Sequence, residues 1–363
     1  MDLQDRVRRL AATANDLSSV RAGLDGVLRQ GVAYDASAIS TVDPATLLWT
    51  SCYISGLPAG GEEERERLLY SIEFEADDIN PYSELSNSGR LIARLHRDTG
   101  GDLTLARRYR ELLRDLGVRD EMRVVLANRG MVWGTLALYR VGSRSPFNDR
   151  DEEVVRSAIA AMADLFRFAM LRAAVDHPGG LDRPPGMLVV APDGRITASS
   201  PAADRWLETI DDRGRIPSVV RAVAAAAAAD GALAHAALPT PGGPWVMLHA
   251  SPMAGESGIG VIVEEARPAI LSEVIAAAHG LTAREREVTA LASQGRSNKQ
   301  IAQELGLSVF TVQDHLKSVF AKIGVQSRAE LVAALYVRHY EPRRQAGATP
   351  SPYGWYLDDA AIA

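Results

Sequence analysis

Residues 281–335 read LTAREREVTALASQGRSNKQIAQELGLSVFTVQDHLKSVFAKIGVQSRAELVAAL, and this stretch carries the clearest helix signals of the 363-residue chain. A Ser or Thr that is followed three residues later by Glu or Gln predicts a capping box, in which each side chain bonds the backbone of the other. The stretch holds three such pairs: Thr282 with Glu285, Ser297 with Gln300, and Ser327 with Glu330. Ser308 is an N-cap without a box partner, and glycines stand where the preceding helices should end, at Gly295, Gly306 and Gly324. The pattern predicts four short helices joined by tight turns.

The third of these helices, about residues 309–323, has two unlike sides. Its apolar residues are spaced three and four apart and form one stripe, which predicts burial: Val312, Leu316, Val319, Phe320 and Ile323. At about 100° per residue, the opposite side carries Phe310, Asp314, Lys317, Ser318 and Ala321, with Gln313 at its edge. A helix-turn-helix unit presents such a side to the major groove of DNA. The alternative is a plain four-helix packing unit with a solvated face, which needs neither these caps nor this spacing of glycines.

Charge is unevenly spread along the chain. Residues 280–340 hold eight Lys/Arg against five Asp/Glu, whereas residues 1–279 hold 30 against 38. Every lysine of the chain lies in the basic segment, although the formal net charge of the whole chain is −6. A small positive module on an acidic body confines DNA contact to one place. Charge alone does not decide the function, because the clustering of the few lysines can also be a chance result in a proteome that uses arginine in place of lysine.

The same stretch resembles the LuxR/GerE family of helix-turn-helix regulators. It matches LTxRExEV at 281–288, GxSNKxIAxxLxxS at 295–308 and TVxxHxxxxxxKxGVxxRxEL at 311–331. The resemblance implies a four-helix module whose third helix reads DNA and whose fourth often pairs two protomers. Carried onto this chain, it makes three residues candidates for base contacts: Gln313, Asp314 and Lys317. It makes four residues candidates for phosphate contacts: Lys299, Thr311, His315 and Lys322.

The residue types suit these roles. Lysine can donate to guanine O6 or N7, glutamine can pair with adenine, and aspartate can accept from cytosine N4. Thr311 falls in the first turn of the third helix, where free N–H groups and the helix dipole favour a phosphate. The family often has Lys or Arg after the Thr-Val pair, whereas this chain has Gln313 and acidic Asp314. This departure should weaken non-specific attraction to phosphates and give base contacts or dimerisation more weight.

Three arginines of the stretch have a simpler interpretation. Arg284, Arg286 and Arg328 are interpreted as solvated side chains or as residues that pair within the module rather than with DNA.

Residues 1–175 mix helical and strand patterns. Helices are predicted at 3–28, 62–70, 105–116 and 150–171, and strands at 36–42, 47–53, 122–127 and 132–141. The run DEMRVVLANRGMVWGTLALYR, followed by SPFNDRDEEVV, resembles the last hairpin and closing helix of a GAF domain. The resemblance implies a domain that senses a small molecule or simply dimerises.

A second sensor-like unit is predicted at residues 187–265, after a Pro- and Gly-rich linker at 176–186. Its order of strands and helices, with VAPDGRITASSPAADRWL at 190–207, resembles a PAS domain. The unit contains no cysteine, so it lacks the flavin-attaching residue of light-sensing PAS domains. The alanine run at 222–229 is interpreted as helix filler and residues 266–279 as a connecting helix. Residues 341–363 form a flexible tail whose aromatic cluster at 353–357 either docks onto a front domain or is unstructured.

The predicted fold is therefore multi-domain α+β. A GAF-like α/β domain and a PAS-like α/β domain precede a C-terminal all-α four-helix LuxR-type helix-turn-helix domain at 280–340. Cys52 is the single cysteine, so no intrachain disulfide is possible, and a cytoplasmic location is expected. No stretch approaches the ~20 apolar residues of a membrane helix. His96 and His235 lack partners at ligand spacing, so neither a metal nor a cofactor is expected.

Absent residues also restrict the input signal. A phosphoacceptor receiver domain needs a lysine beside its acidic pocket, and no lysine precedes Lys299. A P-loop ATPase needs the motif Gly-Lys-Ser/Thr, which the sequence lacks. Neither phosphorylation of a receiver nor ATP-driven assembly is therefore expected as the input. The preferred hypothesis is a homodimeric transcription factor whose front domains bind a small effector. The second hypothesis is the same factor with ligand-free front domains that serve as dimer or protein-interaction surfaces. The third is an enzyme with a DNA module, which is disfavoured because no nucleophile–base–orienter set is present.

Overall fold

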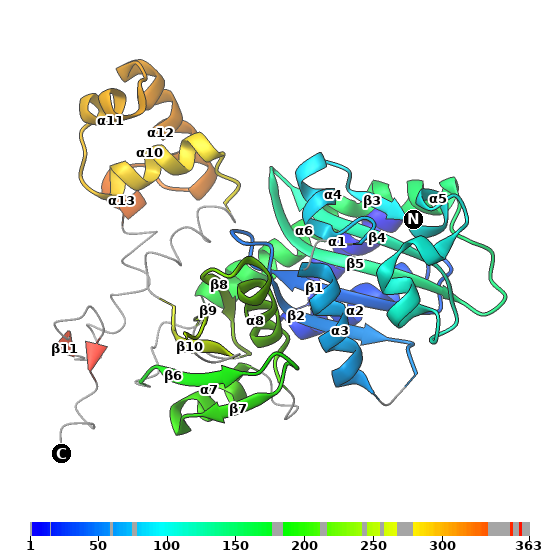
Figure 1. Cartoon of the computed structure of the whole chain (residues 1–363). Coiled ribbons are helices and arrows are strands. Elements are labelled where there is room, and N and C mark those ends of the chain that lie inside the picture. The colour runs from blue at the N-terminus through cyan, green and yellow to red at the C-terminus, as the bar shows by residue number, and fades with distance from the viewer. Residues whose placement is uncertain are drawn as a thin grey trace. The chain divides into compact units, whose positions relative to one another are not determined.

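The structure is a computed structural model of the 363-residue chain (Figure 1). It describes residues 2–14, 16–58, 61–74, 78–175, 184–210, 216–241, 245–254, 258–266, 279–332, 349–350 and 356–357. The chain divides into two compact units. The first unit contains residues 1–169, 184–241 and 246–264, and the second contains the remaining residues, including 265–363.

The first sheet of the first unit is antiparallel and has the strand order β2-β1-β5-β4-β3. Its strands are β1 (Ala36–Val42), β2 (Trp49–Ser55), β3 (Ile92–Arg94), β4 (Val118–Asn128) and β5 (Met131–Val141). The accompanying helices are α1 (Leu3–Thr13), α2 (Leu17–Leu28), α3 (Glu62–Phe74), α4 (Tyr82–Ser88), α5 (Leu95–Asp98), η1 (Leu103–Leu105), η2 (Tyr109–Leu113) and α6 (Asp149–Val175). The β4–β5 hairpin turns at Arg129 and Gly130, whose φ angles of 53° and 74° match the twist of the two strands.

Successive side chains along a strand point to opposite faces of the sheet, and helices of the domain cover each of these two faces. On one face, Ala36 and Tyr139 pack with leucines of α3 and η2. On the other face, Ser37 donates to the Asp25 carboxylate of α2 at 2.5 Å. Helix α6 lies on that second face, where a Cβ at Gly134 would stand 3.2 Å from the Phe166 ring. The first sheet is therefore enclosed on both sides.

The helices of this domain differ from the sequence prediction in three places. The helical pattern over 3–28 forms two helices, because α1 ends at Thr13 and Asp16 caps the start of α2 through a capping box with Ser19. The helix predicted at 105–116 is wrong in extent: its regular part is the five-residue π-helical turn η2. Helices α4 and α5 and strand β3 were not predicted, since each is too short to show a hydrophobic period.

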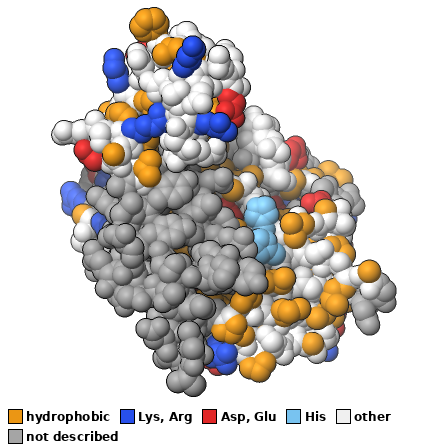
Figure 2. All heavy atoms as spheres, turned by 90° about the vertical axis from the view of Figure 1, so that its left-hand side faces the viewer, with side chains coloured by type: hydrophobic (Ala, Val, Ile, Leu, Met, Phe, Trp, Pro, Cys, Tyr) orange, Lys and Arg blue, Asp and Glu red, His pale blue; other side chains and the backbone are white. Residues whose placement is uncertain are grey.

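The second sheet has the order β7-β6-β10-β9-β8, so its strands follow the same relative order as those of the first sheet. Its elements are β6 (Gly186–Val190), β7 (Ile196–Ser199), α7 (Pro201–Ile210), α8 (Ser218–Asp230), β8 (Ala234–Pro239), β9 (Trp245–Pro252) and β10 (Ile259–Glu265). Helix α7 lies against one face so closely that a Cβ at Gly186 would stand 2.4 Å from the Ala203 Cα. The opposite face exposes Met187 and Ile262, and Figure 2 shows hydrophobic side chains gathered there. Among the described residues, this face has no cover.

Helix α8 joins the two sheets of the first unit. It packs against β2 and α3 on one side and against β8 on the other. Nearby, Asp43 in the loop after β1 accepts a hydrogen bond from the N–H of Ala237 in β8 at 2.8 Å. Arg221 of α8, 5% exposed, lies 3.7 Å from Glu66 of α3. The alanine run is therefore more than helix filler, because its small buried side chains let α8 lie close to both sheets.

The second unit contains a module of helices that fall where the caps and glycines predict them. They are α10 (Ala283–Ser293), α11 (Asn298–Leu305), α12 (Val309–Ile323) and α13 (Arg328–Val332). Farther along, β11 (Thr349–Pro350) and β12 (Tyr356–Leu357) pair antiparallel. Most of the predicted linker, connecting helix and tail lie outside the described residues, at 176–183, 267–278, 333–348, 351–355 and 358–363. In the part of the chain that is described, no helix has the length and apolar content to cross a bilayer.

Candidate nucleic-acid interface

The first three helices of the module begin at capped residues. Thr282 Oγ1 accepts from the N–H of Glu285 at 3.2 Å, while the Glu285 carboxylate accepts from the N–H of Thr282 at 2.7 Å. Ser297 and Gln300 form the same reciprocal pair at the start of α11. Ser308 caps α12 by accepting from the N–H of Thr311 at 3.0 Å. These bonds confirm two predicted capping boxes and the simple cap of α12.

The third predicted box differs in one bond. Ser327 Oγ accepts from the N–H of Glu330 at 3.1 Å, but the Glu330 carboxylate accepts from the N–H of Gln326 at 2.8 Å instead of that of Ser327. The predicted helix-ending glycines all have left-handed backbone, with φ angles of 83°, 64° and 77° at Gly295, Gly306 and Gly324. Glycine adopts this conformation without strain, which fixes the turns between the helices.

A shared core sets the rotation of α12 about its axis. Val312 and Val319 are fully buried, and Leu316 is 6% exposed. They face buried side chains of the neighbouring helices, among them Val288 of α10 and Ile301 of α11. Because these residues of α12 lie on one stripe, their burial determines which residues face outward.

The three predicted base-contact residues lie together on the outward side of α12. Gln313, Asp314 and Lys317 are all exposed. Lys317 Nζ lies 3.9 Å from Asp314 Oδ1, and the two side chains are 79% and 78% exposed. A pair this exposed contributes little to stability, so both charged groups remain accessible to another molecule. Phe310 also lies on this side and is 78% exposed.

The predicted phosphate contacts have less uniform surroundings. Lys299 is exposed near the start of α11, and His315 is half-buried on α12. Thr311 is half-buried, its N–H already donates to Ser308, and the two hydroxyl oxygens are 2.9 Å apart. A phosphate at the start of α12 would therefore meet an N–H of Thr311 that the cap has already engaged.

Lys322 is tied to the interior of the module. Its Nζ lies 2.6 and 2.8 Å from the two carboxylate oxygens of Glu285, whose side chain is 5% exposed. Ser318 donates to the same carboxylate at 2.6 Å, although the helical period places Ser318 on the outward side. Burial alone would raise the pKa of Glu285, but hydrogen bonds from Lys322, Ser318 and Thr282 outweigh it and lower that pKa to about 2. The ionised carboxylate therefore joins α10 to α12 at neutral pH.

The three arginines interpreted as intramodule residues do bond within the module. Arg284 donates to the carbonyl of Leu305 at 2.6 Å, and Arg328 donates to the carbonyl of Ala292 at 2.9 Å. Arg286 donates to a backbone carbonyl just before α10 at 3.2 Å. Their guanidinium groups bond backbone oxygens at helix ends, which supports the turns that separate the helices.

Comparison with known proteins identifies the same segments. A family described as bacterial regulatory proteins, luxR family, matches residues 279–335, and the GAF domain family matches residues 27–165. The spore germination protein GerE of Bacillus subtilis is 44% identical over 55 residues, which are 15% of this chain and 74% of that protein. The chain belongs to the LuxR family of bacterial regulatory proteins.

Other relatives of the LuxR-family chain are named as transcriptional regulators rather than as enzymes. The monoamine regulon transcriptional regulator of Klebsiella aerogenes is 46% identical over 57 residues, 16% of this chain and 25% of that protein. The transcriptional regulatory protein DesR of Bacillus subtilis is 34% identical over 65 residues, 18% of this chain and 33% of that protein. The chain thus spans a third or less of the length of these two relatives.

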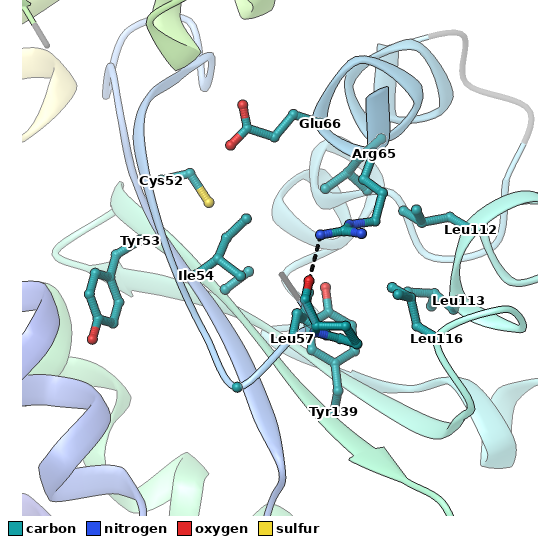
Figure 3. Close-up of a pocket in the computed structure, with 14 residues that line it drawn as sticks. Cys52, Tyr53, Ile54, Leu57, Arg65, Glu66, Leu112, Leu113, Leu116 and Tyr139 are labelled. Carbon is teal, nitrogen blue, oxygen red and sulfur yellow. Dashed lines mark hydrogen bonds between the residues drawn. The ribbon is translucent and has the colours of Figure 1, made fainter. Parts of the chain in front are cut away.

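The GAF domain of the LuxR-family chain contains a cavity of about 230 Å³ (Figure 3). Aliphatic side chains from β2, α3, η2 and the loops beside them form much of its wall: Ile54, Leu57, Leu69, Leu112, Leu113 and Leu116. Cys52 and Tyr139 add polar atoms from the sheet, and Arg65 and Glu66 add charged groups from α3. An apolar cavity with a few polar groups is the usual form of a small-molecule site. No sequence signal identified it, because its lining comes from separate segments.

The sheet face that lines the cavity continues into a chain of buried ion pairs. Arg108 lies 2.7 Å from Asp78 and 2.6 Å from Glu121, and Arg123 lies 2.8 Å from Glu73 and 3.3 Å from Glu121. All five side chains are 6% exposed or less. Burial alone would raise the pKa of Glu121, but the two guanidinium charges outweigh it and hold that pKa below its ordinary value. This part of the face is filled by groups that pair with one another.

Proposed function

We propose that the chain is a sequence-specific DNA-binding transcriptional regulator and that α12 is its recognition helix in the major groove. The observation that carries this proposal is that Gln313, Asp314 and Lys317 are all exposed on one side of α12. The other side of this helix is buried in the core of the module, and its start is capped. Membership of the LuxR family supports the same function. Donors and acceptors of these types distinguish base pairs in the major groove, so we assign base contacts to these three residues.

We assign phosphate contacts to Lys299, Thr311, His315 and Lys322. Among the two lysines of this set, Lys322 contributes less, because Glu285 already neutralises its charge within the module. Asp314 opposes phosphate attraction on the same surface. Base contacts and the pairing of two copies therefore supply much of the specific affinity.

The test of the reading side compares two lysines. Lys317→Ala should weaken binding to a selected operator by about 5- to 150-fold, or 1–3 kcal/mol, and should change binding to random DNA little. Lys299→Ala should weaken binding to both DNAs by a similar factor and reduce the dependence on salt. Fluorescence anisotropy of the full chain at two salt concentrations measures these effects. Unchanged operator binding by Lys317→Ala would contradict the assignment.

We further propose that a small effector in the GAF-domain cavity modulates DNA binding. The aliphatic lining with Cys52, Tyr139 and Glu66 suits a small, largely apolar molecule. Such an effector acts only if it binds one arrangement of the two DNA-binding modules better than another. We propose that those modules belong to a homodimer whose recognition helices lie about one DNA turn apart.

The proposed domain layout follows the sequence prediction. It comprises a GAF-like domain at 1–175, a linker at 176–186, a PAS-like domain at 187–265, a connecting helix at 266–279, the DNA-binding domain at 280–340 and a tail at 341–363. The strand order of the second sheet and the β6–β7 turn at Gly194, with a φ of 76°, support the PAS-like assignment. A cytoplasmic location fits a DNA partner.

A second candidate is the same regulator with ligand-free front domains that act as dimer or protein-interaction surfaces. The buried ion pairs favour it, because they fill part of the sheet face beside the cavity. A metabolite panel screened by the melting temperature of the full chain separates the two candidates, with Leu113→Trp as a filled-cavity control. A compound that raises the melting temperature of the wild type but not that of the control supports the effector. If no compound of a broad panel raises the melting temperature, the second candidate is favoured.

A further inference from the structure

The open face of the second sheet carries large apolar side chains that nothing in the proposed DNA contact uses. Along β6, Leu188 and Val190 point to the covered side and are 2% and 3% exposed, whereas Met187 points outward and is 64% exposed. Ile262 of β10 is the cross-strand partner of Met187 and is 41% exposed. Two large apolar side chains therefore stand side by side on the surface of the sheet.

The surroundings of this pair are hollowed and carry little charge. A hollow of about 480 Å³ lies over the face, and its lining includes Leu233 and Met253, which are 64% and 39% exposed. The described residues that line it include no Lys, Arg, Asp or Glu. His249, which does line it, lies 3.4 Å from Glu264 through its Nε2, and Figure 2 shows the hydrophobic side chains beside a pair of histidines. The face is thus apolar, and the carboxylate of Glu264 beside it lies close to the imidazole of His249.

We infer that this face is the surface through which two copies of the chain pair, an inference that rests on the homodimer of the proposed function. A two-fold axis places each group of a face against the same patch of the other copy. A face with unpaired charges would then meet like charge, whereas this one brings apolar side chains together. An acidic or basic peptide would find no opposite charge along the described lining. Exposed apolar patches of this kind mark sites of association.

The place of the face in the chain suits the pairing of two DNA-binding modules. Strand β10 lies in the middle of the sheet and ends at Glu265, and α10 begins at Ala283. The residues between them, 266–282, span at most about 60 Å when fully extended. Recognition helices of a helix-turn-helix dimer lie about 34 Å apart in successive major grooves. Two copies that pair beside β10 therefore have enough chain to place both modules on one operator.

The test places a charge on the open face of the full-length chain. In sedimentation equilibrium the wild type should have twice the mass of the 39.1 kDa chain. Ile262→Asp and Met187→Asp, each made singly, should raise the dimer dissociation constant at least about 100-fold, because pairing would bury two unpaired carboxylates. The matched control is Leu105→Asp on η1, a residue 58% exposed in the first domain, which should remain dimeric. Thermal melting followed by circular dichroism verifies that the variants are folded.

Each other outcome overturns the inference in a distinguishable way. Dimeric Ile262→Asp places the dimer contact elsewhere and leaves the DNA-binding proposal intact, since Lys317→Ala tests that separately. If the wild type is a monomer, native mass spectrometry identifies a small molecule in the hollow by its added mass. If the wild type is a monomer without added mass, the Ile262→Cys thiol on a Cys52→Ser background is treated with a maleimide. A thiol that resists this reagent shows that another segment of the same chain covers the face. A monomer whose Ile262→Cys thiol reacts freely shows that nothing covers it.

Discussion

Strand β4 and helix α12 each carry an acid and a base close together in sequence, and the two pairs have opposite surroundings. Glu121 and Arg123 of β4 are 1% and 3% exposed and belong to a chain of ion pairs. Asp314 and Lys317 of α12 are 78% and 79% exposed. The same residue types thus serve the fold in one region and remain accessible to a partner in the other. Surroundings, rather than residue type, decide which role a charged side chain takes.

The energetic reason is the cost of removing a charge from water. A buried ion is tolerated only while all its partners are present, so deleting one partner is strongly destabilising. An exposed pair is screened by water and contributes ~0–1 kcal/mol to stability. The contrast between β4 and α12 should therefore appear directly in the free energies of unfolding of matched variants.

The largest expected effect is in β4. Glu121→Gln should lower the free energy of unfolding of the first unit by about 3–5 kcal/mol, because it leaves Arg108 and Arg123 buried with one carboxylate fewer. Urea denaturation of the full chain, followed by a probe in the first unit, measures this change. A loss below about 1 kcal/mol would mean that the charges of β4, like those of α12, contribute little to the free energy of unfolding.

An intermediate effect is expected for Glu285, the carboxylate that holds Lys322. Its pKa is lowered from 4.5 to about 2 in the folded module, so its stabilisation is fully present above the ordinary pKa and is lost as the pH falls from about 5 towards 2. The pKa difference corresponds to roughly 2–3 kcal/mol at neutral pH, after allowance for the partial exposure of Lys322. Glu285→Gln should therefore destabilise the module at pH 7 but much less at pH 3. A loss of stability that is equal at the two pH values would rule out the ion pair as its cause.

The smallest effect on stability is expected in α12. Asp314→Asn should change the free energy of unfolding by less than about 0.5 kcal/mol, because the side chain is already in water. Its affinity for random DNA should nevertheless rise by about 2- to 5-fold, since one negative charge is removed from the proposed DNA-binding surface. Denaturation and anisotropy on the same preparation give both values. A variant that loses stability without gaining affinity would place Asp314 among the structural charges.

The helices of the DNA-binding module could be predicted because their boundaries are encoded locally. Each cap bond joins residues three or four apart, and each helix-ending glycine adopts a left-handed backbone. The outward side of α12 followed from its apolar stripe in the same way. Ser318 was the exception, because its partner Glu285 lies on another helix and no local pattern relates the two.

The site features of the first unit are non-local, and the sequence did not reveal them. The cavity lining comes from segments that only the folded sheet brings together. Likewise, Arg108 precedes η2, Asp78 follows α3 and Glu121 lies in β4, so only the folded domain brings these three charges together. The order of strands and helices predicted at 187–265 indicated a second sheet, but not that one face would lack a cover among the described residues. These features depend on tertiary contacts, which hydrophobic periodicity does not encode.

Helix α8 has a consequence for how the first unit can change in evolution. Because its buried alanines let it pack against strands of both sheets, the two sheet-containing parts of the first unit depend on one shared helix. Recombination that replaced either part alone would leave β2 and α3 without α8 as their neighbour and would expose apolar surface that favours aggregation. The two parts are therefore expected to be exchanged together in evolution, and change within either part to be limited to substitutions that keep the contacts of α8.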